Sequence, residues 1–134
     1  MNDLPPGMIE LSRTDQGGGK VLVRVDQITT IEKSTELGMV GSAVVTFNNG
    51  HSHAFVDGLD VIRFKIDVVK MLDQFVDGTR PGDGSPILMK RDQLTMVECT
   101  LHLGQSGKSL CTYGNGRTHA IAENYEAFKA KLRT

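Results

Sequence analysis

The chain has 134 residues, of which 39% are hydrophobic, and its formal net charge is −1 at pH 7. This length fits one domain, or two small units that share a core, because either half alone would bury too little surface. The near-neutral charge argues against strong nonspecific binding to nucleic acid. No apolar run is long enough to span a membrane, so we expect a soluble protein.

Strand signals dominate the first half of the chain. The predicted strands are Met8 to Arg13, Lys20 to Val25, Ile28 to Lys33, Ala43 to Phe47 and His51 to Val56. The glycines of Thr14–Gly19 suit a hairpin loop between the first two strands. Asn49-Gly50 lies between the last two, and an Asn-Gly pair is typical of a type I′ hairpin turn.

A helix is predicted to follow these strands, with Asp57 as a possible cap and a span from about Leu59 to Val76. Its apolar residues form two adjacent stripes: Val61, Phe64, Val68, Met71 and Phe75, and Ile62, Ile66, Val69, Leu72 and Val76. Together they cover about half of the circumference, against an apolar arc of about 100° for an ordinary surface helix. We therefore expect this helix to pack against the other half of the chain or to form the interface of a homo-oligomer, a dimer or higher.

The second half offers fewer strands than the first. Residues 77–85, rich in glycine, read as a linker. The predicted strands are Ile87 to Lys90, Leu94 to Leu101, Ser109 to Tyr113 and Thr118 to Ile121, with Asn115-Gly116 at a turn. Asn124 can cap a final helix that ends near Leu132. No counterpart of the Met8 to Arg13 strand is predicted.

The two halves are a tandem repeat with an offset of 66 residues and no gap. Fourteen identities support the repeat: Leu22, Asp26, Gln27, Thr29, Glu32, Leu37, Gly38, Gly41, Thr46, Asn49, Gly50, His53, Ala54 and Lys65 recur at the offset positions. We predict a first repeat at 1–76, a linker at 77–85 and a second, shorter repeat at 86–134, with one shared core. The expected fold is mainly β with α (α+β), in which antiparallel sheet-then-helix units form a small barrel-like or shared-sheet domain.

Several chemical motifs are weak in this sequence. Gly17-Gly18-Gly19-Lys20 lacks the strand-to-helix setting of a phosphate loop. His51 and His53 could hold a metal on one strand face, but the second repeat has Arg117 at the first of these positions, so we expect no metal or cofactor. No nucleophile, base and orienting group are suitably spaced, so we expect no enzyme activity. Cys99 and Cys111 read as core thiols more readily than as a disulfide.

The remaining candidates are hydrogen-bond donors and aromatic rings at strand ends and turns. The candidate ligand-binding residues are Arg13, Arg24, His53, Arg91, Tyr113, Asn115, Arg117 and His119. Guanidinium groups grip phosphate bidentately and aromatic rings stack on bases, so such a set suits a nucleotide. Solvated strand ends are the simpler interpretation. Arg117, which follows the Asn115-Gly116 turn, is the first candidate for a phosphate contact.

The first repeat resembles the FlbD type of flagellar and swarming-motility protein. The matching motifs are Met8-Ile9-Glu10-Leu11-Ser12-Arg13, Ile28 to Glu32, and Val45 to Gly50 before a closing helix. The second repeat matches only from Arg91 onward. The resemblance implies a small regulatory protein that acts through protein–protein contacts in flagellar control.

The duplicated, mostly β architecture is also similar to the phage Thoeris anti-defence sponge proteins. That resemblance implies a cytoplasmic, oligomeric, non-enzymatic protein that sequesters cyclic ADP-ribose-type signals or cyclic dinucleotides, in the host cytoplasm if the protein is phage-encoded. We take this function as the expectation, with the FlbD-like regulatory role as the alternative. Neither a nucleic acid polymer nor a membrane is an expected partner.

Overall fold

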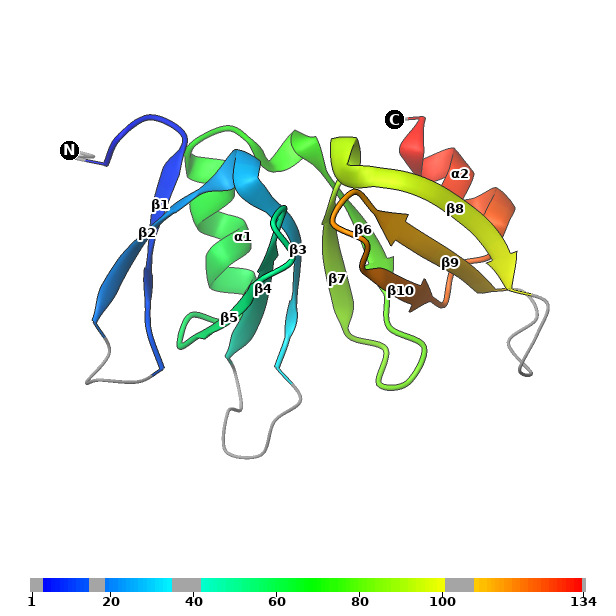
Figure 1. Ribbon diagram of the computed structural model, residues 1–134, viewed down its shortest axis with the longest axis horizontal. Helices are drawn as coiled ribbons and strands as arrows, with labels where there is room; N and C mark the ends of the chain where they lie inside the picture. The colour runs from blue at the N-terminus through cyan, green and yellow to red at the C-terminus, as the bar shows by residue number, and fades with distance from the viewer. Residues whose placement is uncertain (1–3, 15–18, 35–41, 101–107, 134) are drawn as a thin grey trace.

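The computed structural model describes residues 4–14, 19–34, 42–100 and 108–133, and two similar sets of strands, each followed by a helix, account for most of it (Figure 1). The first set is β1 (Met8–Ser12), β2 (Lys20–Arg24), β3 (Ile28–Lys33), β4 (Ala43–Phe47), β5 (Ser52–Phe55) and α1 (Leu59–Val68). The second set is β6 (Phe75–Thr79), β7 (Pro86–Lys90), β8 (Leu94–Thr100), β9 (Lys108–Tyr113), β10 (Thr118–Ile121) and α2 (Tyr125–Leu132). Short 3-10 turns lie at Val25–Gln27, Leu72–Gln74 and Arg91–Gln93.

The offset of 66 residues relates most of these elements one to one, down to details of backbone geometry. β2 and β7 coincide at this offset, as do β5 and β10. A register shift between Ile28 and Thr30 recurs between Leu94 and Met96. Gly50 and Gly116 lie at the two predicted hairpin tips, with φ values of 90° and 86°, in the region where glycine is favoured. The predicted type I′ turn is wrong, because it needs a positive φ at Asn49 and Asn115 as well, and Lys70 is the one described non-glycine residue that has it. The identities between 35 and 41 and between 101 and 107 lie outside the described residues.

Three antiparallel sheets result, and the largest is shared by both repeats. Its strand order is β5-β4-β3-β7-β6, so the β6–β7 hairpin of the second repeat completes a sheet of the first. β1–β2 and β10-β9-β8 form the other two sheets. The predicted mainly β, α+β fold with a shared sheet is therefore confirmed, and no closed barrel forms among the described strands.

Single backbone contacts continue the strand series from sheet to sheet. Val56 N donates to Ser12 O (2.8 Å), which links the end of β5 to β1. Ala122 N donates to Thr79 O (2.7 Å) at the equivalent place in the second repeat. The spatial order is thus β2-β1, β5-β4-β3, β7-β6 and β10-β9-β8, a series with β2 at one end and β8 at the other.

Two hydrophobic cores lie along this series, and β7 separates them. Because side chains alternate along a strand, Leu88 enters the first core while Ile87 and Met89 enter the second. Phe75 of β6 also packs in the first core, beside α1 residues such as Ile62. The first core is therefore closed by a hairpin that belongs, in the chain, to the second repeat.

The predicted Leu59–Val76 helix is too long, and this error hid a strand. α1 ends at Val68, and Lys70 has a positive φ of 61°, a conformation that a continuing helix cannot contain. Phe75 begins β6, which occupies part of the predicted linker 77–85 and is the counterpart of β1 that the sequence prediction lacked. The 76/77 boundary between repeat and linker therefore falls within a strand.

The apolar surplus of this helix is correspondingly smaller than predicted. Phe75 and Val76 are buried in β6 rather than displayed on a helix. Val61, Phe64 and Val68 do remain exposed on α1. An oligomer formed through this helix face stays a prediction, and the exposed apolar surface that supports it is smaller than expected.

The two cysteines occupy different settings. Cys111 is buried in the second core and Cys99 is exposed on β8, and both are free. Burial raises the pKa of the Cys111 thiol to about 12, with a further contribution from the charge of Glu123. Among the helices that the structure describes, none is long and apolar enough to cross a membrane.

Candidate functional site

Basic side chains gather where strands end along one edge of the molecule. We call Arg13, Lys20, Lys33, Arg80 and Lys108 the basic edge. The residue pairs at the ends of the four hairpins concerned are Ser12 with Lys20, Lys33 with Ala43, Thr79 with Pro86, and Thr100 with Lys108. The corresponding strand ends lie along the lower side of Figure 1.

Strand register brings these four hairpin ends to the same edge. Arg13 forms a bridge with Phe55, which pairs with Ala43 beside the end of β3. Glu32 pairs with Ile87, so the β6–β7 loop follows directly along the edge. The order of cations therefore runs from the first sheet, across the shared sheet, to the third sheet.

Most of the basic edge remains available to solvent. Arg13, Lys20 and Lys33 are exposed, and Arg80 and Lys108 are half-buried. Arg80 is held in place, since its Nη1 donates to Lys33 O (2.6 Å) and its Nε lies 3.7 Å from Asp83. Within the described chain, Lys33 and Lys108 have no ion-pair partner, so their charges are not neutralised locally.

A repeated polar contact, which we call the buckle, fixes each hairpin to its helix beside this edge. In the first repeat, Ser12 N donates to Asp57 Oδ1 (2.7 Å), and Lys65 Nζ donates to Asp57 Oδ2 (3.0 Å) and to Glu10 O (2.6 Å). The buckle therefore joins β1 to α1.

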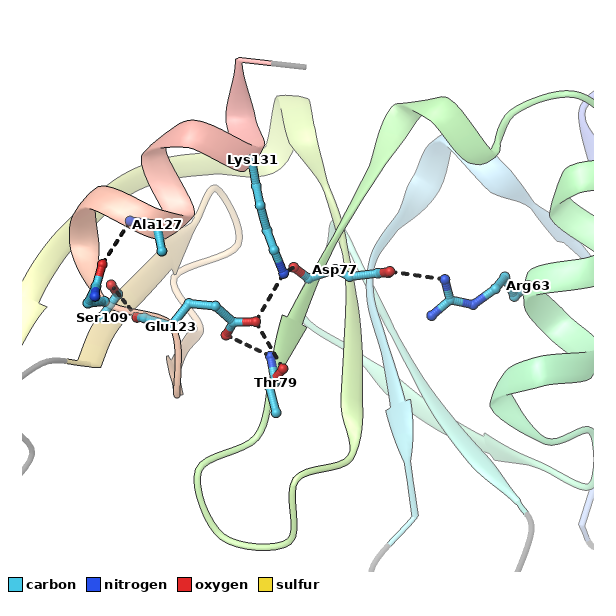
Figure 2. Close-up of polar contacts among 8 residues, drawn as sticks. Arg63, Asp77, Thr79, Ser109, Glu123, Ala127 and Lys131 are labelled. Carbon is cyan, nitrogen blue, oxygen red and sulfur yellow. Dashed lines mark hydrogen bonds and ion pairs between the residues drawn. The ribbon is translucent and has the colours of Figure 1, made fainter.

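The second buckle repeats this arrangement with a longer acid (Figure 2). Thr79 N and Oγ1 both donate to Glu123 (2.9 Å each), and Lys131 Nζ donates to Glu123 Oε2 (3.0 Å) and to Asp77 O (3.0 Å). Arg63 reaches Asp77 from α1 (3.1 Å), so this buckle also links the two repeats.

Both buckle carboxylates are stabilised in the charged form. Burial alone raises the pKa of Asp57, but the hydrogen bond from Ser12 and the Lys65 ammonium outweigh it and lower the pKa below its usual value. Burial likewise raises the pKa of Glu123, but the hydrogen bonds from Lys131 and Thr79 outweigh it, so the pKa is again below its usual value. At neutral pH these acids are ionised and neutralised by lysine.

The eight residues predicted from sequence do not form one site. Arg13, Arg24 and His53 line a cavity of about 510 Å³ between β2 and β5, together with Phe47. Arg117 and His119 line another of about 480 Å³ with Glu32. The structure thus splits the predicted set, and no observation tests any of its members as a ligand contact.

His119 of β10 connects Tyr113 of β9 to Glu32 of β3. Its Nδ1 lies 3.1 Å from the Tyr113 hydroxyl, and its Nε2 lies 3.2 Å from Glu32 Oε2. Burial would raise the pKa of Glu32, but the hydrogen bond and charge of His119, with the charges of Arg80 and Arg117, lower it. Burial raises the pKa of Tyr113 well above its usual value, so this phenol stays neutral.

Asn115, Arg117 and Arg91 make hydrogen bonds that connect parts of the fold. Asn115 Nδ2 donates to Phe47 O (3.0 Å), and Arg117 Nε donates to Gly50 O (2.9 Å), so the second hairpin tip is pinned to the first. Arg91 Nη1 donates to Leu132 O (3.3 Å) at the end of α2. Arg117, the first candidate for a phosphate contact, therefore already has a structural partner.

Sequence reasoning missed most of the basic edge. Of its five residues, only Arg13 was among the candidates; Lys20, Lys33, Arg80 and Lys108 were not. The available signal was position: each lies next to a predicted strand end or in a predicted loop. Among the described residues, no group of three or more His, Cys, Asp or Glu side chains could hold a metal ion.

Comparison with known proteins gives a likeness of fold. No protein-family model matches the sequence, and no curated protein is significantly similar to it. Among solved structures, the chain is similar to the LytTr DNA-binding domain of a putative methyl-accepting/DNA response regulator from Bacillus cereus. The TM-score is 0.60 at 14% sequence identity, over 95% of this chain and 96% of that one.

This likeness corrects the functional predictions made from sequence. The structural neighbour is a DNA-binding domain, which contradicts both the sequestration of cyclic nucleotides and the exclusion of a nucleic acid polymer as partner. It supports neither the FlbD-like role nor the Thoeris sponge resemblance. The net charge of −1 sums the whole surface, so it gives no ground for excluding a locally basic edge.

Proposed function

We propose that this chain is a DNA-binding domain that contacts the phosphate backbone through the basic edge. The proposal is carried by the row of five cations at hairpin ends, in a fold shared with a domain that is named for DNA binding. We propose a binding role without catalysis, in contrast to an enzyme that acts on DNA.

Cations at the strand ends could by themselves give a sequence-independent affinity for DNA, because they contact phosphates. Each lysine or arginine that neutralises a phosphate releases condensed counterions, so affinity falls steeply as salt rises. Strand pairing and the two buckles fix the spacing of the strand ends that carry these cations before binding, which reduces the entropy lost on association. Sequence preference would come from additional contacts to base edges.

The test is a salt titration of binding to a fluorescent duplex of random sequence, with a single-stranded oligonucleotide of the same length as comparison. Wild-type protein should bind the duplex with a dissociation constant that rises steeply with salt. The Lys33→Ala/Lys108→Ala double variant should weaken binding across all sequences and reduce the salt slope by about 2, or about 1 per phosphate contact.

Arg24→Ala is the matched control for this experiment. Arg24 is an exposed cation at the far end of β2 from Lys20, so it carries the same charge on the same strand but away from the basic edge. Binding by this variant should equal that of wild type. Loss of affinity in Arg24→Ala but not in the double variant would place the contact on the opposite edge, and no salt-dependent binding by wild type would reject the proposal.

A further inference from the structure

The two end strands of the series, β2 and β8, are the repeat counterparts of β7 and β3, which pair with each other inside the molecule. Internally, β3 pairs with β7 through Thr30 with Met89, Ile31 with Leu88, and Glu32 with Ile87. In the repeat, β8 is the counterpart of β3, and β2 is the counterpart of β7. Within the described chain, β8 pairs only with β9, and β2 pairs only with β1.

Burial differs sharply between the internal contact and its unpaired counterparts. Leu88 on β7 is 1% exposed, whereas Leu22 at the same position of β2 is 47% exposed. Thr30 on β3 is 1% exposed, whereas Met96 at the same position of β8 is 50% exposed. Two apolar side chains thus face solvent at the positions where the internal contact excludes it.

Among the described residues, no strand covers the second core on the side where a hairpin covers the first. Ile28 and Ile31 are fully buried in the first core, but their counterparts Leu94 and Val97 are only partly buried in the second. The missing cover corresponds to Phe75 and Leu88, which a hairpin supplies to the first core. Met8 pairs with Arg24 as Phe75 pairs with Lys90, so the half-buried Met8 is the counterpart of Phe75 in strand pairing. The counterpart of Leu88 is the exposed Leu22.

We propose that copies of this chain associate head to tail, with β2 of one copy pairing with β8 of the next in the register of β3 with β7. Transferred by the repeat offset, that register sets Met96 opposite Val23, Val97 opposite Leu22, and Glu98 opposite Val21. The β1–β2 hairpin then closes the second core of its neighbour, as β6–β7 closes the first core.

A second copy fits this surface because β3 and β7, the repeat counterparts of β8 and β2, already pair within the chain. An added strand satisfies the backbone N–H and C=O groups that an edge strand leaves open, and apolar side chains supply the specificity. The two surfaces differ, so the contact is heterologous, and a pair of copies keeps one free edge at each of its ends. Rings or open chains of copies therefore follow, and the association needs no DNA.

Sedimentation and light scattering over a wide range of protein concentration test this proposal, with two variants that alter one edge each. Leu22→Lys places a charge on β2, and Met96→Lys places one on β8. Both side chains are about half exposed in the single chain, so the fold should tolerate them. Wild type should show a mass that grows with concentration, and each variant alone should remain monomeric.

The decisive measurement is an equimolar mixture of the two variants. Leu22→Lys protein retains an intact β8 and Met96→Lys protein retains an intact β2, so the mixture should form a 1:1 dimer and stop there. Val61→Lys, an apolar-to-lysine change on the exposed face of α1, is the matched control and should associate like wild type.

Three results would overturn the proposal. If the wild-type protein has the mass of a monomer at every concentration, the β2 edge does not pair, and Lys20 and Arg24 protect it. A mixture that stays monomeric although wild type associates would show a contact that is not head to tail. Dissociation by Val61→Lys alone would place the interface on α1.

Discussion

The first and second cores contain equivalent strands and helices, but within the described part of the chain a neighbouring hairpin closes the first core and none closes the second. Its β3 residues Ile28 and Ile31 are fully buried because the β6–β7 hairpin lies on the outer edge of β3. Leu94 and Val97 hold the same positions on β8 and remain partly buried, because no strand lies on that edge in the described chain. Burial at these positions is therefore decided by the neighbouring hairpin rather than by the residue itself.

The buckles show the opposite behaviour, since a contact of a carboxylate with a lysine and a strand end occurs in both repeats. Each joins the end of a hairpin strand to the helix of its own repeat through a carboxylate and a lysine. These contacts lie within one repeat, so the absence of a next hairpin does not affect them. Local contacts repeat faithfully, and contacts between repeats depend on position in the series.

The largest predicted effect separates Leu88 from its counterpart Leu22. Leu88→Ala should lower the free energy of unfolding by about 2–5 kcal/mol, because it removes a buried side chain from the first core. Leu22→Ala should change it by about 0.5 kcal/mol or less in dilute solution, because Leu22 faces solvent. Urea denaturation measures both, and equal effects would contradict the difference between the cores.

The hairpin tips should behave alike in both repeats. Gly50→Val and Gly116→Val should each lower the free energy of unfolding by about 1–2 kcal/mol, because both positions have positive φ values. Gly82→Val is the control: its backbone does not require glycine and an added Cβ would meet open space, so its stability should be unchanged. Thermal denaturation measures the three, and a harmless substitution at only one tip would break the equivalence.

The smallest effect concerns the buckles and depends on pH. Asp57→Ala and Glu123→Ala should each lower the free energy of unfolding by about 1 kcal/mol at neutral pH, a modest value because the partner lysines are 35% and 42% exposed. Because folding lowers both carboxyl pKa values, their contribution is present at neutral pH and is lost as the pH falls below the usual values of 3.8 and 4.5.

An acid titration of stability in the Asp57→Asn/Glu123→Gln variant checks the sign of this effect. The double variant should lose less stability than wild type between neutral pH and pH values below the usual carboxyl pKa. A wild-type protein that gained stability on acidification would contradict the assignment of charged carboxylates to the buckles.

The local parts of the fold were predictable because their causes are local. Gly50 and Gly116 mark their hairpin tips through a positive φ that residues other than glycine rarely adopt. The end of α1 was not predictable in this way. Phe75 and Val76 continue an apolar spacing that suits a helix, although they lie in β6. Lysine is not a residue type that favours a positive φ, so the sequence does not indicate that the helix ends before Lys70.

The candidate site was harder to predict because it is assembled by register. Lys33, Arg80 and Lys108 are separated by tens of residues, and only the pairing of β3 with β7 and the β6–β10 contact bring them to one edge. Arg117 stays an untested candidate, and the sequence did not show that its Nε donates to Gly50 O. A single sequence shows neither long-range pairing nor prior use of a side chain.

The pairing of β3 with β7 also bears on how such a chain could arise. A protein of one repeat would bury its core only by borrowing the hairpin of another copy, so its folding would depend on protein concentration. Joining two copies in one chain makes that encounter intramolecular, at an effective concentration in the millimolar range for a short connection. The short segment from α1 to β6 thus keeps the first core closed at any protein concentration. The second core, like that of a single-repeat protein, would still need the hairpin of another copy to close it.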